Sequence, residues 1–435
     1  MEPIVTIHSF NEAYAELAAV SITSLVHNNP TRDCHVHIFE NSLGRETIAR
    51  ILTIEQKYAN AKITVHHIPD EAFAEVADGH YGGETWYPML APEMLRDCNK
   101  ALVLEPDTLV CRDISELFDM DLGESPLACH LRKPTRPVHL VIGKPSCFNA
   151  GVLLLNLKCI RKNDTFNMKN LSDAVRMLRL RYSDTSLWIA QESYLNHVLD
   201  HETLLRYSFR FNCFLLLSFL LFHSSDIESH EISIVLSNPA IIHFAGHKPN
   251  SKTCMAFLNV VHKWWEYHAL SPFADSQRDA ARVQEIIEYR NGLRNSICSF
   301  HNYFDYLLLD DLLGAIEKLK QMAENGTQIV FYGIGQWGTG FARIARAMGL
   351  HPDKICDRGK CGTAIDGVGI EPPDILKSDN GNTIVVVAIA EPQTMTEVKN
   401  TLLGFGIPEH HILPVFEQLA LGGRRWNEIL ASVHL

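Results

Sequence analysis

The chain has 435 residues, 46% of them hydrophobic and 21% charged, with 51 acidic against 39 basic residues and a formal charge of −12. That length exceeds one ordinary hydrophobic core and predicts two domains, and the acidic balance excludes a nucleic-acid partner bound through a broad basic surface. Eleven cysteines are scattered singly, without a CxxC pair, which indicates reduced thiols in a cytosolic protein. The N-terminus runs directly into a strand-like segment, so we expect no signal peptide.

Strand and helix patterns alternate through the first part of the chain. This alternation predicts a largely parallel α/β sheet with helices on its faces. The strands are expected at Pro3–His8, His35–Phe39, Lys62–Ile68, Ala101–Leu104 and Gly151–Leu157, and the helices over Ala13–Val26, Arg45–Tyr58 and Asp113–Leu122.

The chain changes character after this region. The segment Phe211–Phe222 is apolar but shorter than the roughly 20 residues that cross a bilayer, so we expect a buried element and no transmembrane segment. Helical periodicity dominates from about Leu270 to Asn325 and ends in an Asn-Gly stop, which predicts a helical spacer. A second strand–helix–strand pattern then begins with the apolar run QIVFY.

Two carboxylates, Glu105 and Asp107, follow the apolar run Ala101–Leu104 and flank Pro106. Side chains two positions apart on a strand share a face, so the pair points to one side if extended geometry continues past Leu104. Pro106 cannot donate a ladder hydrogen bond and marks either the exit of the strand or a sheet edge. Ligands of open α/β sheets bind at the carboxyl ends of strands, and hard cations such as Mn²⁺ or Mg²⁺ favour oxygen ligands. A solvated turn is the alternative interpretation of the same residues.

Four blocks of sequence together resemble the retaining glycosyltransferases of family 8, which include bacterial lipopolysaccharide galactosyl- and glucosyltransferases and glycogenin. The blocks lie between about Ile4 and Asn250 and read AYAELAAVSITSLVHNNP, DCNKALVLEPDTLVCRDISELFDMDLGESPLA, CFNAGVLLLNL and IIHFAGHKP. The resemblance implies a GT-A fold, a nucleotide-binding α/β domain whose Asp-x-Asp motif holds Mn²⁺ on the diphosphate of a nucleotide sugar.

The resemblance also implies a metal centre and a donor pocket. Glu105 and Asp107 match the two Asp-x-Asp positions and His243 matches the third metal ligand, a set of two hard oxygens and one imidazole that suits Mn²⁺. Lys248 would neutralise the departing diphosphate. The residues that match contacts to the nucleotide, its phosphates or the sugar are Asn11, Tyr14, Asn149, Ala150, Gly151, Gly246 and Lys248.

The residues expected at the reacting carbon are Gln191 and Glu192, with Asn149 beside them. The family's Asp-Gln-Asp falls on Gln191-Glu192-Ser193, and a carboxylate at Glu192 would stabilise an oxocarbenium-like transition state or act as a nucleophile. Several positions depart from the family pattern and change or remove charge in the sugar half of the pocket, whereas the metal half is better matched. Besides Glu105, which replaces an Asp, the departures are Asn11, Ala13, Pro88, Arg132 and Asn250.

A second motif lies near the C-terminus. Gly333, Gly335 and Gly338 form a GxGxxG loop between an apolar run and a helical pattern, where glycines permit a tight turn and close approach of a phosphate. Asp357 follows the next strand, where an acid can bind a ribose hydroxyl. The region resembles small Rossmann-like modules appended to bacterial capsule, sialic-acid and methyltransferase enzymes, which implies nucleotide or NAD binding. A Rossmann shell used only for assembly is the alternative.

Taken together, the sequence predicts four segments: a GT-A domain at 1–268, a helical linker at 269–326, a Rossmann-like domain at 327–420 and a tail at 421–435. The expected activity is Mn²⁺-dependent, retaining transfer of a hexose from a UDP-sugar to a saccharide acceptor in surface polysaccharide or lipopolysaccharide synthesis. We expect it in the cytoplasm, at the inner membrane where its acceptors are lipid-linked. The alternatives are a catalytically degenerate nucleotide-sugar-binding regulator and an NAD-dependent activity in the C-terminal domain.

Overall fold

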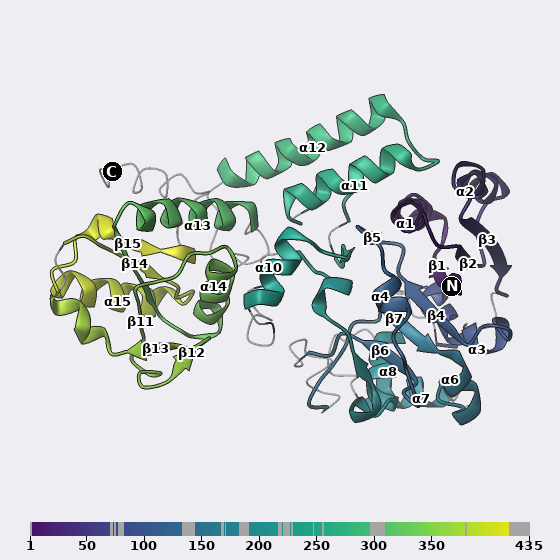
Figure 1. The fold of residues 1–435 in the computed structure, drawn as a ribbon, viewed down its shortest axis with the longest axis horizontal. Helices are drawn as coiled ribbons and strands as arrows, with labels where there is room; N and C mark the ends of the chain where they lie inside the picture. The colour runs from purple at the N-terminus through teal and green to yellow at the C-terminus, as the bar shows by residue number, and fades with distance from the viewer. Residues whose placement is uncertain are drawn as a thin grey trace. The chain divides into compact units, whose positions relative to one another are not determined.

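The chain forms two compact units in the computed structural model (Figure 1). One contains Met1–Cys213, Asn238–Lys248 and His262–Asp279, and the other contains Phe214–Ser237, Pro249–Val261 and Ala280–Leu435. The domain boundaries after residues 268, 326 and 420 stay predictions, and the expected tail lies outside the described residues. The structure describes residues 2–69, 73, 75–76, 82–132, 144–166, 169, 171–181, 191–215, 220, 227, 229–246, 248–254, 256–295, 309–378 and 381–416.

The first unit is built on a mixed sheet whose described strands follow the order β3-β2-β1-β4-β7-β6-β8. Strands β1, β2, β3 and β4 are parallel to one another, as predicted. The parallel expectation is wrong for β7, which pairs antiparallel with both β4 and β6. The strands are β1 (Ile4–Ser9), β2 (Cys34–Glu40), β3 (Ala61–His67), β4 (Lys100–Leu104), β6 (Leu127–Cys129), β7 (Val152–Asn156) and β8 (Leu205–Arg206).

The antiparallel pairing of β7 determines what lies at the end of β4. Leu104 pairs with Val152, so the residue that precedes β7, Gly151, lies beside Glu105. The backbone N–H of Glu105 donates to the carbonyl oxygen of Gly151 over 2.9 Å. A parallel β7 would have brought its opposite end to this place, so the sheet topology is what joins the two segments.

Helices cover the first sheet, and α1 and α2 lie beside its β1–β3 part (Figure 1). The two helices expected near the N-terminus are present, whereas the one expected over Asp113–Leu122 is shortened to a single turn. Asp113 accepts a hydrogen bond from the Ser115 N–H at the start of that turn. The helices are α1 (Ala15–Asn28), α2 (Arg45–Lys57), α3 (Ala91–Met94), α4 (Ser115–Phe118), α6 (Leu157–Asn163), α7 (Leu171–Arg181) and α8 (Gln191–Val198), with 3₁₀ turns at Glu12–Tyr14, Gly83–Leu90, His201–Thr203 and Phe209–Phe211. Helix α11 (Leu258–Leu270) belongs to this unit from His262 onwards, and its residues up to Val261 belong to the other.

Helix α1 supports a small two-stranded sheet that continues from the end of β4. Ser21 Oγ lies 2.8 Å from Thr108 Oγ1, and Ser24 Oγ accepts from the Val110 N–H over 3.0 Å. Because these side chains are short, β5 (Thr108–Val110) can approach the helix closely. The Val110 N–H, on the edge of β5 that does not pair with β9, is satisfied by Ser24. The other edge of β5 pairs antiparallel with β9 (Ile241–His243).

The second unit contains another sheet, with the described strand order β12-β13-β11-β10-β14-β15. The predicted strand–helix–strand pattern is present as β10, α14 and β11, and β10 is parallel to both β11 and β14. Its elements are α10 (Ser229–Ser237), α13 (Leu309–Glu324), β10 (Gln328–Tyr332), α14 (Gln336–Ala347), β11 (Lys354–Cys356), β12 (Ala364–Ile365), β13 (Val368–Glu371), a 3₁₀ turn at Pro373–Ser378, β14 (Thr383–Val387), α15 (Pro392–Gly404), a 3₁₀ turn at Glu409–His411 and β15 (Ile412–Pro414), while α12 (Ser276–Asn295) has residues in both units.

The expected helical spacer contains α12 and α13, and its residues 296–308 lie outside the described part of the chain. In the apolar segment Phe211–Phe222, the described residues Phe211, Phe214 and Leu220 are buried, as expected, and residues 216–219 and 221–222 lie outside the description. Among the described helices, none combines the length and the apolar character that crossing a membrane requires.

The first unit holds a buried histidine that acid should destabilise. His8 on β1 is fully buried, its ring nitrogens have no hydrogen-bond partner among the described residues, and burial lowers its pKa to about 3. The unfolded chain therefore binds this proton more readily, and stability falls as pH drops from about 6.5 towards 3.

We predict that protonation of His8 lowers the free energy of unfolding of the wild-type first unit by about 1.4 kcal/mol when the pH falls from 7.5 to 5.5. In His8→Leu this part of the loss should vanish. Urea unfolding followed by the fluorescence of the buried Trp86 and Trp264 measures it. Thr6→Val is the control, because Thr6 is buried two positions away on the same strand and carries no titratable group. An equal loss of stability in His8→Leu and wild type would refute the assignment.

Candidate functional site

The turn after β4 brings two carboxylates together. The strand ends at Leu104, so the condition of continued extended geometry is not met, and Pro106 lies just beyond the exit of the strand. The Thr108 N–H donates to the Glu105 carbonyl oxygen over 3.1 Å, and the Thr108 hydroxyl donates to the same oxygen over 2.8 Å. This closed turn, and not strand alternation, carries Glu105 and Asp107 to the same place.

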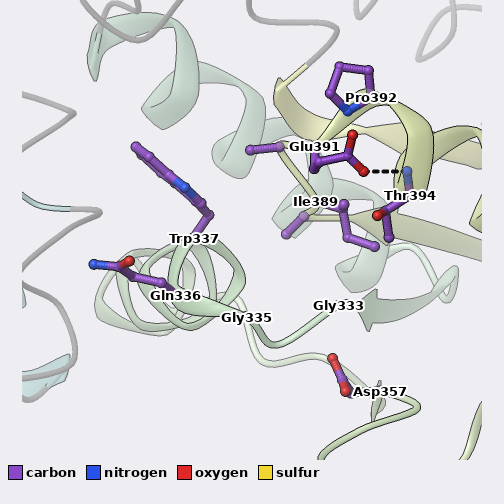
Figure 2. A pocket seen from close by; sticks show the side chains of 11 residues that line it. Gly333, Gly335, Gln336, Trp337, Asp357, Ile389, Glu391, Pro392 and Thr394 are labelled. Carbon is purple, nitrogen blue, oxygen red and sulfur yellow. Dashed lines mark hydrogen bonds between the residues drawn. The ribbon is translucent and has the colours of Figure 1, made fainter.

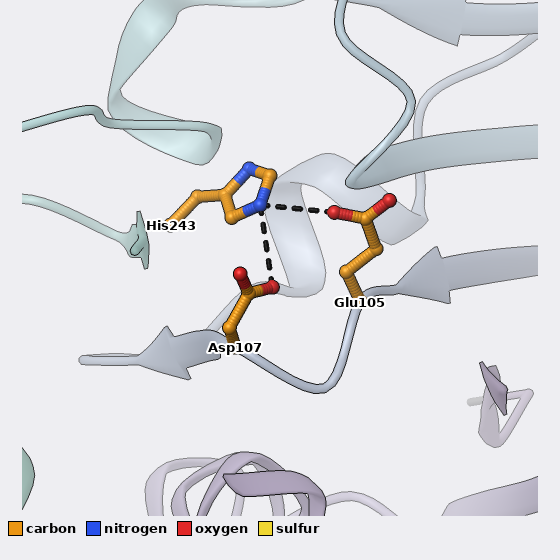
Figure 3. A group of neighbouring side chains, drawn as sticks. All are labelled: Glu105, Asp107 and His243. Atoms are coloured by element: carbon orange, nitrogen blue, oxygen red, sulfur yellow. Dashed lines mark ion pairs between the residues drawn. The ribbon is translucent and has the colours of Figure 1, made fainter. Parts of the chain in front are cut away.

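His243 meets both carboxylates because β9 pairs with β5 in a register that sets His243 opposite Thr108. Its Nε2 lies 3.0 Å from Glu105 Oε2 and 3.3 Å from Asp107 Oδ1 (Figure 3). One ligand atom from each of the three residues lies within 4.8 Å of the others. The side chains of His243 and Asp107 are buried, whereas that of Glu105 is 40% exposed. The three residues predicted as metal ligands are therefore neighbours at the rim of the sheet.

Charge is balanced tightly in this cluster. Burial favours the neutral form of His243, but the carboxylates of Asp107 and Glu105 outweigh it and raise the pKa of the imidazole to about 9. Burial also favours the neutral form of Asp107, but His243 and Lys248 hold the pKa of that carboxyl well below its usual range. Two carboxylates this close require a positive charge between them, which either an imidazole proton or a cation can supply.

Lys248 is a second positively charged side chain at this site, besides His243. Its Nζ donates to Asp107 Oδ2 and, over 3.3 Å, to the Phe244 carbonyl oxygen. The ammonium lies 5.8 Å from the centre of the Tyr14 ring. Burial opposes the charged form, but Asp107, Tyr14 and Glu105 raise the pKa of Lys248 overall. Gly246 adopts a φ of 92°, which an L side chain rarely tolerates, and so permits the turn between β9 and Lys248.

The donor set fits a hard divalent cation. Two carboxylates and one imidazole supply the oxygen and nitrogen ligands that Mn²⁺ accepts. Gly151 leaves the room they need: a Cβ there would lie 2.1 Å from His243 Cε1 and 2.9 Å from Glu105 Oε2. The family resemblance assigns Gly151 to the sugar pocket, but in the structure Gly151 lies directly against the predicted metal ligands His243 and Glu105.

A cavity of about 240 Å³ opens beside this cluster. Of the predicted binding residues, it brings together Asn11, Tyr14, Ala150 and Lys248, and of the predicted catalytic residues it reaches Gln191. Sequence reasoning missed Gly82, Glu84 and Thr85 of the wall, because nothing in that stretch marks it as ligand-binding. The residues that line the cavity are Ser9, Phe10, Asn11, Tyr14, Gly82, Glu84, Thr85, Pro88, Val103, Leu104, Glu105, Pro106, Asp107, Ala150, Gln191 and Lys248.

Asn149 and Glu192 take a different place from Gln191. The Glu192 carboxylate accepts from the Asn149 side chain over 2.6 Å and from the Ala150 N–H over 3.2 Å. Asn149 Oδ1 accepts from the Gly151 N–H over 2.9 Å. Of these two predicted catalytic residues, neither is among the described residues that line the cavity. They hold the loop that forms its wall.

The second unit contains a separate cavity of about 640 Å³ (Figure 2). Of the residues predicted to bind a nucleotide, Gly333, Gly335 and Asp357 line it, and Trp337, Ile389 and Glu391 line it as well. Gly338 has a packing role, because a Cβ there would lie 1.7 Å from the Gly333 carbonyl oxygen.

Asp357 already accepts three backbone hydrogen bonds. Its Oδ2 accepts from the Ile334 N–H over 2.7 Å, and its Oδ1 accepts from the N–H groups of Gly359 and Lys360 over 2.8 and 3.0 Å. The carboxylate therefore fixes the glycine loop and its own turn. A ribose contact would have to use its remaining lone pairs.

We predict that Gly151→Ala lowers the affinity for Mn²⁺ by about tenfold or more. The added methyl group must displace the His243 ring or the Glu105 carboxylate, since both lie closer to it than carbon contacts allow. Electron paramagnetic resonance of free Mn²⁺ in titrations of the full chain measures the affinity. Gly314→Ala is the matched control, because nothing lies within 4 Å of a Cβ there. Unchanged Mn²⁺ affinity in Gly151→Ala would show that the glycine is not needed for the centre.

Known proteins resemble the part of the chain that contains the carboxylate–histidine cluster. The model of the family described as "Glycosyl transferase family 8" matches residues 5–254. Glycosyltransferase GlyA of Streptococcus pneumoniae is 24% identical over 265 residues, which are 60% of this chain and 34% of that protein. Glycosyltransferase GlyF of the same species is 22% identical over 273 residues, which are 60% of each chain. The chain thus spans about a third of the first relative and less than two thirds of the second.

Solved structures share the fold. A crystal structure of galactosyltransferase LgtC with donor and acceptor sugar analogues matches with a TM-score of 0.52 and 21% identity, over 63% of this chain and 98% of that one. The apo structure of the bifunctional glycosyltransferase WbbM matches with a TM-score of 0.51 and 16% identity, over 65% and 52% of the two chains. The N-terminal part therefore has a GT-A-like fold. Because the family model also matches more than half of its residues, the chain belongs to glycosyl transferase family 8.

Proposed function

We propose that the chain is a metal-dependent glycosyltransferase that transfers a hexose from a UDP-sugar to a saccharide acceptor with retention of configuration. The observation that carries the proposal is the cluster of Glu105, Asp107 and His243 at the wall of a cavity that Lys248 also lines. Anionic and imidazole ligands beside a lysine suit a diphosphate bound through a divalent cation, because both cations offset the charge of the phosphates.

The three residues of the cluster would hold Mn²⁺ or Mg²⁺, and a bound cation would supply Lewis-acid stabilisation to the diphosphate. The chain's own contribution is to orient the donor and to hold charge in place. Lys248 presents a fixed positive charge where negative charge grows as the bond between the anomeric carbon and the diphosphate oxygen breaks. Tyr14, about a third exposed, offers a ring face at the cavity for the uracil base.

The acceptor hydroxyl forms the new bond to the anomeric carbon, and its proton leaves with the UDP oxygen. Of the predicted catalytic residues, Gln191 would contact the sugar, and its position among the residues that line the cavity supports this role. We further propose a role in surface polysaccharide or lipopolysaccharide synthesis in the cytoplasm, where UDP-sugars are made, with lipid-linked acceptors at the inner membrane. The alternative, a regulator that binds the nucleotide sugar without transferring it, is favoured by the departures at Pro88 and Arg132.

Calorimetric titration of UDP with and without Mn²⁺ tests the metal-dependent site. We expect tight binding only with the cation, and a loss of about tenfold or more in Asp107→Asn, because the substitution removes a ligand charge. Asp97→Asn is the control, since this aspartate is exposed in the same unit. Equal UDP binding with and without Mn²⁺ would reject the metal-centred mechanism. Metal-dependent binding with no sugar released or transferred from UDP-hexoses would favour the regulator.

The second cavity supports a second proposal, nucleotide or NAD binding by the C-terminal unit. It lies at the carboxyl ends of the adjacent parallel strands β10, β11 and β14, where strand order reverses, and such switch points are common ligand sites. Trp337 supplies a ring and the first turn of α14 supplies backbone N–H groups.

We predict that Gly335→Leu abolishes nucleotide binding by this cavity while the unit stays folded. Gly335 has a φ of −67° and nothing within 4 Å of a Cβ, so a side chain there enters the cavity without strain. Quenching of tryptophan fluorescence by UDP, AMP and NAD⁺ is measured without Mn²⁺ in Asp107→Asn, in which binding at the first site is weakened. Gly404→Leu, exposed on α15, is the control. If none of the three nucleotides quenches the fluorescence of Asp107→Asn with Gly335 intact, the second proposal is rejected.

A further inference from the structure

A continuous set of hydrogen bonds links the metal cluster to helix α8. His243 Nδ1 lies 3.0 Å from Asn212 Oδ1. Asn212 Nδ2 lies 3.3 Å from Asn149 Oδ1, and Asn149 Nδ2 lies 2.6 Å from Glu192 Oε2. His243, Asn212 and Asn149 are buried, and Glu192 is half-buried. We call His243, Asn212, Asn149 and Glu192 the relay.

The chemistry of its end group sets the direction of every donor in the relay. An ionised Glu192 only accepts hydrogen bonds, so Asn149 must turn its NH₂ group towards it. The Asn149 oxygen then accepts from the Asn212 NH₂ group and from the Gly151 N–H. Asn212 is left with its oxygen facing His243, and the proton of this last bond must therefore be on His243 Nδ1. Donors aligned in one direction strengthen one another, since each bond polarises the next.

This direction determines which nitrogen of His243 is available to a cation. With the proton held on Nδ1, the lone pair of the neutral ring is on Nε2, the atom that lies 3.0 and 3.3 Å from the two carboxylates. Metal-ligating histidines usually donate their second N–H to an acceptor, which fixes the ring and makes the ligand nitrogen more basic. Asn212 is that acceptor here, and the negative charge behind it is on Glu192.

The same contacts place Glu192 away from the reacting centre. Its Oε2 accepts from the Asn149 side chain and from the Ala150 N–H, both on the loop that forms the cavity wall. Gln191, its neighbour on α8, faces the cavity. Taking the proposed metal-dependent function as its basis, we propose that Asn212, Asn149 and Glu192 are positioning residues that orient His243 Nε2 towards the cation. In this arrangement Glu192 is neither a nucleophile nor a direct partner of the sugar.

The test measures Mn²⁺ affinity in the full chain by the resonance of free Mn²⁺. We expect Asn212→Leu to lower the affinity by about 10–100-fold. Glu192→Ala should lower it in the same direction, and Glu192→Gln should restore part of it, because the amide oxygen still accepts from Asn149. Asn29→Leu is the control: the Asn29 side chain is also buried in the first unit, and it bonds to backbone groups, the Leu25 carbonyl and the Ile114 N–H.

A second measurement separates the relay from the metal proposal. In ¹⁵N-histidine-labelled protein without metal, the His243 Nδ1 proton should exchange slowly with water in wild type and faster in Asn212→Leu. If wild type does not bind Mn²⁺, the proposed function fails. Slow exchange of the His243 Nδ1 proton would then still support the orientation of the ring by Asn212.

Two results would overturn the positioning role. In the first, both Asn212→Leu and Glu192→Ala keep the wild-type Mn²⁺ affinity and the wild-type exchange rate of the His243 Nδ1 proton. The other is loss of sugar transfer in Glu192→Gln with unchanged Mn²⁺ affinity, which would make Glu192 a catalytic residue. Should Asn212→Leu fail to fold, the Glu192 variants still decide, because that side chain is only half-buried.

Discussion

The first unit depends on one electrostatic constraint: two carboxylates and a buried imidazole share a space that must also contain positive charge. Breaking such a buried group by removing one member leaves the others unpaired, which costs several kcal/mol. Here the proton of His243 and the ammonium of Lys248 supply that charge. A cation at Nε2 would have to take the place of the proton, so the residues that stabilise the fold are the same ones that would hold a cation.

The backbone around this cluster is arranged to make the contact possible. Residues more than 130 positions apart meet because β5 and β9 pair, and β5 is held in turn by hydroxyl groups of α1. The antiparallel β7 brings Gly151 to the same place, where the missing Cβ makes room for the imidazole. A glycine that looks like part of a sugar-binding motif is thus required by the packing of a histidine.

Particular residues show how far the sequence alone could predict this site. The turn at Pro106 and the exit of β4 follow from local chemistry, because proline cannot continue the ladder. His243 could be placed only through family resemblance, since strand pairing between distant segments leaves no local signal. The direction of β7 was missed for a related reason: an apolar run such as Val152–Leu155 packs equally well in either direction. Asn212 was missed because its role is to link two side chains, His243 and Asn149, that are distant in sequence.

The departures from the family pattern gather in the sugar half, and the packing of the two halves gives a physical reason. In the metal half each residue constrains another: Gly151 borders His243, Lys248 binds Asp107, and Asn212 fixes the imidazole. A substitution there disturbs several buried partners at once. In the sugar half, side chains such as Pro88 and Gln191 face the cavity, and a change alters what the cavity accepts more than it alters the fold. In the proposed transferase, sugar specificity would therefore diverge while the geometry that would hold a cation is retained.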